Sequence, residues 1–234
     1  MYLSRIQLRL ENLTPQMLEK WQSAMPYASH QWLWQLFPEH ATRPFLFRQE
    51  PKARFFVLSD TLPLSSHTLF DIETKPFTPQ LEEGMVLAFQ LRANPVITRK
   101  AKRYDVMMDA KFQAKLRGEA QDTWWDRQLE AAQLWLEKQG LQHGFRLQPS
   151  SSDEFDSWAG TDDTNVSVPT ATIDAYQQHR FMRPGADKSI MYSSVDYSGV
   201  LEIINPSSFE QALFHGIGKS KGLGCGMLMV KRRR

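Results

Sequence analysis

Alternation of hydrophobic and polar side chains predicts four strands in the first half of the chain. In the first of them Ile6 and Leu8 share one face while Arg5 points to the other, as expected for a half-buried strand. Residues 61–84 follow neither the strand period nor the helix period, and we assign no helix to them. The four predicted strands cover residues 2–10, 43–50, 54–60 and 85–93.

Helical spacing predicts two short helices between the first two strands. Thr14 followed by Pro15 is typical of an N-cap residue with proline at the first helical position. Because proline disfavours the helical conformation in the residue before it, we expect Pro26 to end this first helix. A second helix is predicted over residues 27–37.

The second half of the chain shows a similar succession of elements. Residues 96–117 are basic and lack a clear period, which indicates a mobile loop. A helix is predicted from Asp122 with Gly140 as the residue after its C-terminus, and another from a capping box at residues 207–210 to Gly216. Strands are predicted over residues 145–148, 166–176, 190–204 and 225–230, with a loop or disordered segment over 149–165.

This order of elements decides the fold class. Both halves combine strands and helices in the order expected of a βαββαβ unit, so we predict an α+β protein with two tandem ferredoxin-like (RRM-like) βαββαβ domains. We place the domains at residues 1–84 and 85–234. Many unrelated functions share this fold, so the activity has to be argued from particular residues.

Composition excludes several classes of protein. In 234 residues, 41% hydrophobic content with seven Trp and fourteen Phe is typical of a folded globular chain. The single Cys225 rules out an internal disulfide and a cysteine zinc cluster. No apolar run approaches the length of a transmembrane helix and the N-terminus alternates like a strand, so we expect a cytoplasmic protein without a signal peptide or membrane span.

Charge is unevenly distributed along the chain. The net charge is only +2, but residues 92–117 and residues 215–234 each carry a net charge of +6. The remainder is therefore strongly acidic. Two basic clusters on an acidic body indicate that a polyanion is bound at a defined place.

Five glycines and two lysines fall within residues 216–226. Glycine brings peptide N–H groups close to a ligand, and a run of exposed N–H groups flanked by Lys219 and Lys221 suits a phosphate. The segment follows a helix and precedes a strand, so it is neither a Walker loop nor a dinucleotide fingerprint, which excludes a nucleotide-binding enzyme of those types. A flexible helix-to-strand connection is the alternative that spacing alone leaves open.

Tyr27 and His30 form the strongest candidate for catalysis. Three residues apart on a helix, they share one face and reach a common substrate atom. Histidine exchanges protons near neutral pH, whereas tyrosine is better suited to orienting a group. The motif alone does not exclude a histidine that faces water at a helix start. No set of His, Asp and Glu has metal-ligand spacing and no nucleophile elbow is present, so we expect neither a metal nor a cofactor.

Motifs spread over most of the chain coincide with one family. Their order and spacing are specific together, although no single motif is decisive. The sequence resembles the CasE family, CRISPR RNA-processing endoribonucleases of the type I-E Cascade system within the repeat-associated RNase superfamily. The matching segments are residues 1–4, 27–30, 33–38, 89–95, 197–201 and 216–226.

The resemblance implies an activity and a mechanism. Members have tandem ferredoxin-like domains and cut precursor CRISPR RNA at the 3′ base of the repeat stem-loop without a metal ion. The 2′-OH attacks, leaving a 2′,3′-cyclic phosphate and a 5′-hydroxyl, and the enzyme stays on the mature crRNA as a Cascade subunit. The catalytic pair falls on Tyr27 and His30. Gln31 and Gln35 stand where some relatives carry basic residues, which leaves the partners of the scissile phosphate open.

The resemblance also implies partners and RNA contacts. The partners are the repeat stem-loop, as precursor and mature crRNA, and other Cascade subunits, especially the crRNA-backbone subunit. The alternative is a non-catalytic structural RNA-binding protein of the same fold, which has no need of both Tyr27 and His30. The expected RNA contacts are Arg92, Arg99, Lys100, Lys102, Arg103, a basic hairpin with His179, Arg180, Arg183 and Lys188, and the loop residues Gly216, Gly218, Lys219, Ser220, Lys221, Gly222 and Gly224.

Overall fold

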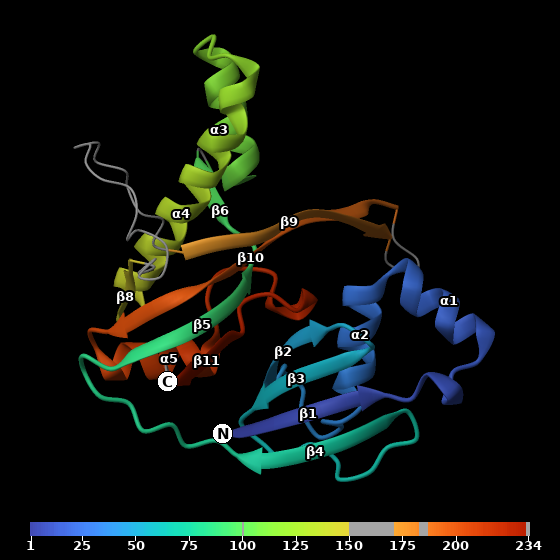
Figure 1. Ribbon diagram of the computed structural model, residues 1–234. Coiled ribbons are helices and arrows are strands. Elements are labelled where there is room, and N and C mark those ends of the chain that lie inside the picture. Colours follow the sequence, from blue (N-terminus) through green and yellow to red (C-terminus); the bar gives the residue numbers. More distant parts are fainter. Residues whose placement is uncertain (100, 150–170, 183–186, 233–234) are drawn as a thin grey trace, which may run out of the picture.

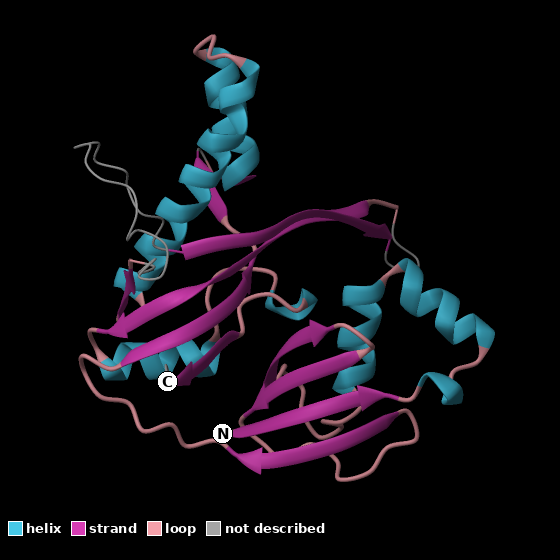
Figure 2. Ribbon diagram, viewed as in Figure 1, coloured by secondary structure: helices cyan, strands magenta, loops and turns pink. Residues whose placement is uncertain are grey.

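Two antiparallel sheets lie side by side, each with helices packed on it (Figures 1 and 2). The structure, a computed structural model, describes residues 1–99, 101–149, 171–182 and 187–232. The predicted RNA contacts Lys100 and Arg183 therefore lie outside the described residues, and so does nearly all of the predicted loop over 149–165. Residue 149 alone belongs to the described part of that loop.

The first sheet has the strand order β2-β3-β1-β4, and every neighbouring pair is antiparallel. Its strands are β1 (Tyr2–Leu8), β2 (Phe45–Glu50), β3 (Arg54–Ser59) and β4 (Phe70–Pro76). Between β1 and β2 the chain forms a short 3₁₀ turn and two helices, η1 (Leu10–Asn12), α1 (Pro15–Ser23) and α2 (Met25–Trp34).

The second sheet repeats this order, β11-β5-β10-β8, with β9 paired to the far part of β10. Counted from its own first strand, each sheet has the order 4-1-3-2 of a ferredoxin-like unit, which confirms the predicted α+β fold. The domain boundary at residues 84 and 85 stays a prediction. The elements are β5 (Val86–Ala93), α4 (Trp124–Gln142), β8 (Phe145–Gln148), β9 (Ala171–Met182), β10 (Ser189–Ile203), α5 (Pro206–His215), η3 (Lys221–Leu223) and β11 (Leu228–Arg232).

Residues 61–84 contain a strand that we did not predict. In β4 the charged residues Asp71 and Glu73 face solvent and form ion pairs with Arg9, which directly follows β1, and with Arg5 of β1. An edge strand with one exposed face has little hydrophobic signal, which explains the omission. The second helix of the first ferredoxin-like unit is absent, because residues 60–69 between β3 and β4 form no helix.

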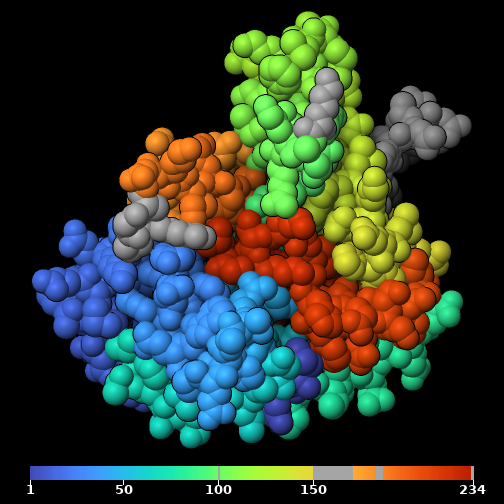
Figure 3. Space-filling model, turned by 180° about the vertical axis from the view of Figure 1, so that it is seen from behind, coloured from blue at the N-terminus to red at the C-terminus, as the bar shows by residue number. Residues whose placement is uncertain are grey.

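The prediction of a mobile loop over residues 96–117 is wrong. These residues form a hairpin, β6 (Val96–Arg99) and β7 (Lys102–Asp105), followed by α3 (Val106–Leu116). Asp105 caps α3 through a hydrogen bond from the Met108 backbone N–H (2.8 Å). We call residues 96–123 the arm. Figures 1 and 3 show that it projects from the body of the protein together with the start of α4.

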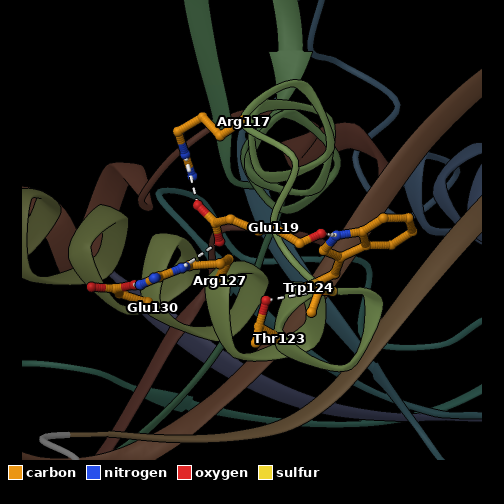
Figure 4. Close-up of polar contacts among 7 residues, drawn as sticks. Arg117, Glu119, Thr123, Trp124, Arg127 and Glu130 are labelled. Atoms are coloured by element: carbon orange, nitrogen blue, oxygen red, sulfur yellow. Dashed lines mark hydrogen bonds and ion pairs between the residues drawn. The ribbon is translucent and has the colours of Figure 1, made fainter.

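Charged groups hold the tip of the arm (Figure 4). Glu119 accepts hydrogen bonds from Arg117 (2.7 Å) and Arg127 (2.9 Å), and its backbone carbonyl accepts one from the Trp124 indole (3.1 Å). The short turn η2 (Gln121–Thr123) leads from this tip into α4. These contacts of Glu119 therefore fix the turn between α3 and α4.

Several predicted boundaries are corrected by a residue or a turn. Gly140 lies inside α4, where an added Cβ would come 2.9 Å from the Phe145 ring, so it permits the packing of α4 on β8. The N-cap of α5 is Asn205, whose side chain accepts a hydrogen bond from the Ser208 N–H (2.9 Å), and the predicted capping box is wrong. The N-cap at Thr14 and the end of α5 at Gly216 are confirmed.

Three hydrophobic clusters form the core of the protein, and the third of them joins the two halves. One lies under the first sheet around Leu33 and Phe47, and a larger one lies under the second sheet around Tyr197. A smaller third cluster joins Leu46 and Met227 between the sheets. The described helices include none that is long and apolar enough to cross a membrane.

Candidate active site

Helix α2 carries Tyr27 and His30 on a half-buried face. Its opposite side is fixed in the core by Ala28 and Trp32, which are both buried. A polar chain adds a second constraint, since the Trp21 indole donates to Ser29 Oγ (2.9 Å) and Ser29 Oγ donates to Gln49 Oε1 (3.0 Å). The helix is therefore tied both to α1 and to β2, which holds the Tyr27 and His30 backbone in place.

His30 lies in a ring of aromatic side chains. The Trp34 ring, one turn further along α2, meets it edge-on with a centroid distance of 5.3 Å. From β2, the Phe45 and Phe47 rings lie at centroid distances of 5.8 and 6.1 Å. These contacts restrict the rotation of the imidazole.

Tyr27 is covered by the second domain. Its ring stacks on Phe181 of β9 with a centroid distance of 6.0 Å. Figure 1 shows how this contact arises, because the hairpin of β9 and β10 extends beyond its own sheet toward α1 and α2. The side chains of the predicted catalytic pair are thus positioned by both halves of the protein.

The glycine loop, residues 216–226, approaches the same helix. A Cβ placed on Gly222 would lie 3.8 Å from His30 Nε2 and 3.5 Å from a guanidinium nitrogen of Arg43. Gly224 has φ +79° and would bring a Cβ within 3.2 Å of Phe47. At Gly224 both the close approach and the backbone conformation therefore favour glycine, whereas the distances at Gly222 are ordinary van der Waals contacts.

The glycine loop is a folded element rather than a row of exposed N–H groups. The N–H groups of Gly216, Gly224 and Gly226 donate to the carbonyls of Ala212 (2.9 Å), Lys221 (3.3 Å) and Arg92 (2.7 Å). The Asn94 amide also donates to Ser220 Oγ (2.6 Å). The predicted continuous run of exposed N–H groups is wrong at these three glycines, and a flexible connection is excluded as well.

Arg43 and the glycine loop, which carries Lys219 and Lys221, bring positive charge close to His30. Burial lowers the pKa of Arg43, and its Nε is buried without a hydrogen-bond partner among the described residues. Burial also lowers the pKa of Lys221, and the positive charges of Arg43 and Lys219 lower it further. In the described part of the chain none of the three forms an ion pair with a carboxylate. Such a cluster suits a bound anion, because a nearby negative charge would stabilise the protonated forms of these side chains.

Sequence reasoning did not find Arg43. The residue lies just before β2, thirteen positions after His30, and was treated only as the start of a strand. No local pattern marks it, because its neighbours at the site come from α2 and the glycine loop.

The predicted RNA contacts on the strands occupy different environments. Arg92 forms a bidentate pair with Asp196 (both 2.7 Å) and donates to the Gln49 carbonyl (3.3 Å), so it links the two domains. His179 bonds Ser194 through Nε2 (2.8 Å) and stacks on Tyr192. The next residue, Arg180, points to the opposite face of β9 and is exposed. His179 and Arg180 are thus not presented on one surface, whereas Lys188 lies exposed just before β10.

The basic residues of the arm lie away from α2 (Figure 1). Arg99 is paired with Asp109 of α3 at 3.0 Å, and Lys102 and Arg103 are exposed on β7. The structure therefore does not bring these predicted contacts to the site that holds His30, and any RNA they bind has to extend along the molecule.

Comparison with known proteins identifies the family of this chain. Residues 1–232 match the family described as CRISPR associated protein. The chain belongs to this family. The match spans both sheets and both candidate elements of the site, α2 and the glycine loop, and it confirms the resemblance to CasE-type proteins.

Individual members are similar over most of their length. The chain is 28% identical over 212 residues to the CRISPR system Cascade subunit CasE of Escherichia coli, covering 87% of this chain and 90% of that protein. It is 27% identical over 223 residues to the CRISPR-associated endoribonuclease Cse3 of Thermus thermophilus, covering 88% and 90%. A structure of Thermus thermophilus Cse3 bound to an RNA representing a pre-cleavage complex has the same fold, with a TM-score of 0.70, 22% identity and 98% of each chain covered.

Proposed function

We propose that this protein is a CRISPR RNA-processing endoribonuclease that cuts precursor CRISPR RNA within its repeats. The proposal rests mainly on one observation: helix α2, which carries Tyr27 and His30, lies close to Arg43 and to the glycine loop with Lys219 and Lys221. A proton-transfer group beside uncompensated positive charge suits cleavage of a phosphodiester. The names of the relatives, CasE and the endoribonuclease Cse3, support the same activity.

The reaction uses a nucleophile that RNA itself supplies. The 2′-OH next to the scissile phosphate loses its proton and attacks phosphorus, the bond from phosphorus to the 5′ oxygen breaks, and that oxygen gains a proton. The products are a 2′,3′-cyclic phosphate upstream and a 5′-hydroxyl downstream. His30 transfers one of these two protons, and Tyr27, held by its stack on Phe181, orients the reacting groups. This route needs no metal ion.

Arg43 and Lys221 stabilise the charge that develops on the phosphorane. Arginine binds phosphate oxygens through several N–H donors, and a guanidinium nitrogen of Arg43 lies next to Gly222, which also approaches His30. Lys221 adds a point charge from the glycine loop. These two residues therefore take the role that Gln31 and Gln35, which carry no charge, leave open.

The hairpin of β9 and β10 is proposed to hold the repeat stem-loop, so that the cut falls at the 3′ base of the stem. The exposed Arg180 and Lys188 supply its positive charge. Because these contacts involve the upstream fragment, the enzyme stays on the mature crRNA after the cut. It then serves as a subunit of a Cascade complex, in contact with the crRNA-backbone subunit.

The competing function is that of a non-catalytic RNA-binding subunit of the same fold. Purified protein and a synthetic repeat RNA separate the two, with single-turnover cleavage and binding measured together. We expect His30→Ala to keep its affinity and to cut about 10²–10⁴-fold more slowly, which is the usual contribution of general acid–base catalysis. Tyr27→Phe keeps the ring and should lose less activity.

His67→Ala serves as the matched control, because His67 lies in the loop before β4 and contacts Phe70 rather than the site. It should cut at the wild-type rate. A wild-type protein that binds the RNA tightly and never cuts it would establish the non-catalytic alternative.

A further inference from the structure

A cavity of about 520 Å³ lies between the two domains next to the start of α2. Trp21 and Pro26 line it from the helices, and Phe47 and Gln49 from β2. The hairpin of β9 and β10 contributes Gln177, His179 and Tyr192, and the glycine loop contributes Leu223 and Gly224. Its size falls within the range of roughly 300–1,000 Å³ that small-molecule sites occupy.

The lining has the chemistry of a site for a flat heteroaromatic ring. The partly exposed Tyr192 ring provides a stacking surface, and the amides of Gln49 and Gln177 provide donors and acceptors. The Tyr192 ring is fixed by its stack on His179, with a centroid distance of 4.4 Å and an interplanar angle of 15°. Burial raises the pKa of the Tyr192 phenol well above its ordinary value, so the group remains a neutral donor.

The cavity adjoins the segments that carry the proposed catalytic pair. Pro26 directly precedes Tyr27 in the chain. The Phe181 ring contacts Tyr27 at a centroid distance of 6.0 Å and meets Tyr192 edge-on at 6.5 Å. On the other side, Gly224 lines the cavity while Gly222 of the same loop contacts His30. A ligand in the cavity is therefore close to the two segments that approach the proposed reaction site, the start of α2 and the glycine loop.

We propose that this cavity binds the unpaired nucleobase immediately 3′ of the scissile phosphate. The inference rests on the proposed cleavage at the 3′ base of the stem. Bases upstream of the cut are paired in the stem and cannot enter a pocket, whereas the next nucleotide downstream is single-stranded. Single-stranded bases are bound by aromatic faces and by side chains that reach their edges, the chemistry present here.

Capture of this base has a mechanistic consequence. It turns the downstream nucleotide away from the stem and so fixes the direction in which its 5′ oxygen leaves. The attacking 2′ oxygen, phosphorus and the leaving oxygen have to lie nearly in line, and holding both sides of the phosphate favours that alignment. The cavity therefore affects the rate of cleavage more than the affinity for the stem.

Substrates with one missing base test the proposal. One repeat RNA carries an abasic nucleotide directly 3′ of the cut, and a control RNA carries it several nucleotides further downstream. We expect the first to bind normally and to be cut about tenfold more slowly, given the usual contribution of base stacking and edge contacts. The control should be cut at the normal rate. Equal rates for both RNAs would overturn the proposal.

A pair of variants on β9 makes the test residue-specific. Gln177 lines the cavity, whereas Gln178 points to the other face and donates to the Tyr176 phenol (3.0 Å). Gln177→Ala should slow cleavage of the intact RNA several-fold and have no added effect on the abasic RNA. Gln178→Ala should alter neither. Additive effects of Gln177→Ala and the missing base would contradict a shared site.

A binding measurement separates this inference from the proposed cleavage. An RNA with a 2′-deoxy nucleotide 5′ of the cut carries 2-aminopurine at the downstream position, and its fluorescence reports stacking without any reaction. We expect quenching with the wild type, and weaker quenching with Tyr192→Leu.

Unchanged fluorescence on saturation would overturn the cavity proposal, even for a protein that cuts RNA. Quenching by a protein that never cuts RNA would support the proposed base-binding cavity and contradict the proposed endoribonuclease activity. If a protein segment rather than a base fills the cavity, the probe stays bright.

Discussion

At the scale of single residues, the site is built from charges that lack carboxylate partners in the described part of the chain. Burial lowers the pKa of Arg43, and burial together with the positive charges of Arg43 and Lys219 lowers the pKa of Lys221. Proteins ordinarily compensate partly buried charge, so a cluster without compensation indicates a bound anion. This feature separates the site from the exposed, ion-paired arginines elsewhere on the surface, such as Arg5 and Arg9.

Replacement of Arg43 should affect catalysis and stability in opposite directions. Arg43→Gln removes a proposed donor to the phosphorane, so we expect single-turnover cleavage to fall by about 10²-fold, as for other donors to a developing charge. Thermal stability should stay the same or rise, because a partly buried cation without a hydrogen bond to its Nε is lost. A merely structural arginine would instead lower the melting temperature and leave the cleavage rate of the folded protein unchanged.

Because of Lys221, the affinity for RNA should vary with pH in the alkaline range. Its pKa lies below the ordinary 10.5 in the free protein, and a bound phosphate raises it again, so binding takes up a proton in that window. Affinity for the repeat RNA should therefore fall as the pH rises through the lowered pKa. The free protein should become slightly more stable over the same range, because the unfolded chain holds this proton more tightly.

Arginine at position 221 remains charged throughout this range. The pH dependence of RNA affinity should then disappear in Lys221→Arg, as measured by titrations at several alkaline pH values. A Lys221→Arg protein with the same alkaline loss of affinity as the wild type would remove Lys221 from the phosphate site.

At the scale of elements, the hairpin of β9 and β10 serves two purposes on its two faces. One face carries His179 and Phe181 toward the first domain, where they line the cavity and cover Tyr27. The other carries exposed residues such as Arg180. The alternation of a strand assigns these roles, since neighbouring residues point to opposite faces.

The hairpin and the arm should differ in the kind of RNA contact they make. We expect Arg180→Ala and Lys188→Ala to weaken binding of the cognate stem-loop more than binding of an unrelated hairpin. Lys102→Ala and Arg103→Ala on the arm should weaken both alike, and should flatten the salt dependence by about one unit per lost phosphate contact. Equal behaviour of the two pairs in salt titrations would contradict a specific role for the β9–β10 hairpin.

The elements also show which patterns the sequence reveals. Alternation located β1, β5 and β10 because one face of each is packed against a core. The arm was mistaken for a loop, because its lysines and arginines obscure the period of α3, whose stability depends on the cap at Asp105 and on contact with α4. Tyr27 and His30 could be paired from sequence as neighbours on one helix, whereas Arg43 and the cavity depend on contacts between distant segments.

At the scale of the whole molecule, neither half contains the complete site. The first domain supplies Tyr27, His30 and Arg43, while Lys221 and the cover over Tyr27 come from the second. Arg92 fixes the two halves relative to one another through Asp196 and the Gln49 carbonyl. The proposed RNA path, from the hairpin past α2 into the cavity, likewise crosses both domains.

The nucleophile is the central claim, and one substrate tests it directly. A repeat RNA with a single 2′-deoxy nucleotide just 5′ of the scissile phosphate is incubated with the protein in excess EDTA, beside the all-ribose RNA. The all-ribose RNA should be cut to a 2′,3′-cyclic phosphate and a 5′-hydroxyl. The deoxy RNA should bind almost as well, because one hydroxyl contributes only about 0.5–1.5 kcal/mol, and should remain uncut. Cleavage of the deoxy RNA, or a 5′-phosphate on the downstream product, would show that water attacks and would contradict the proposed mechanism.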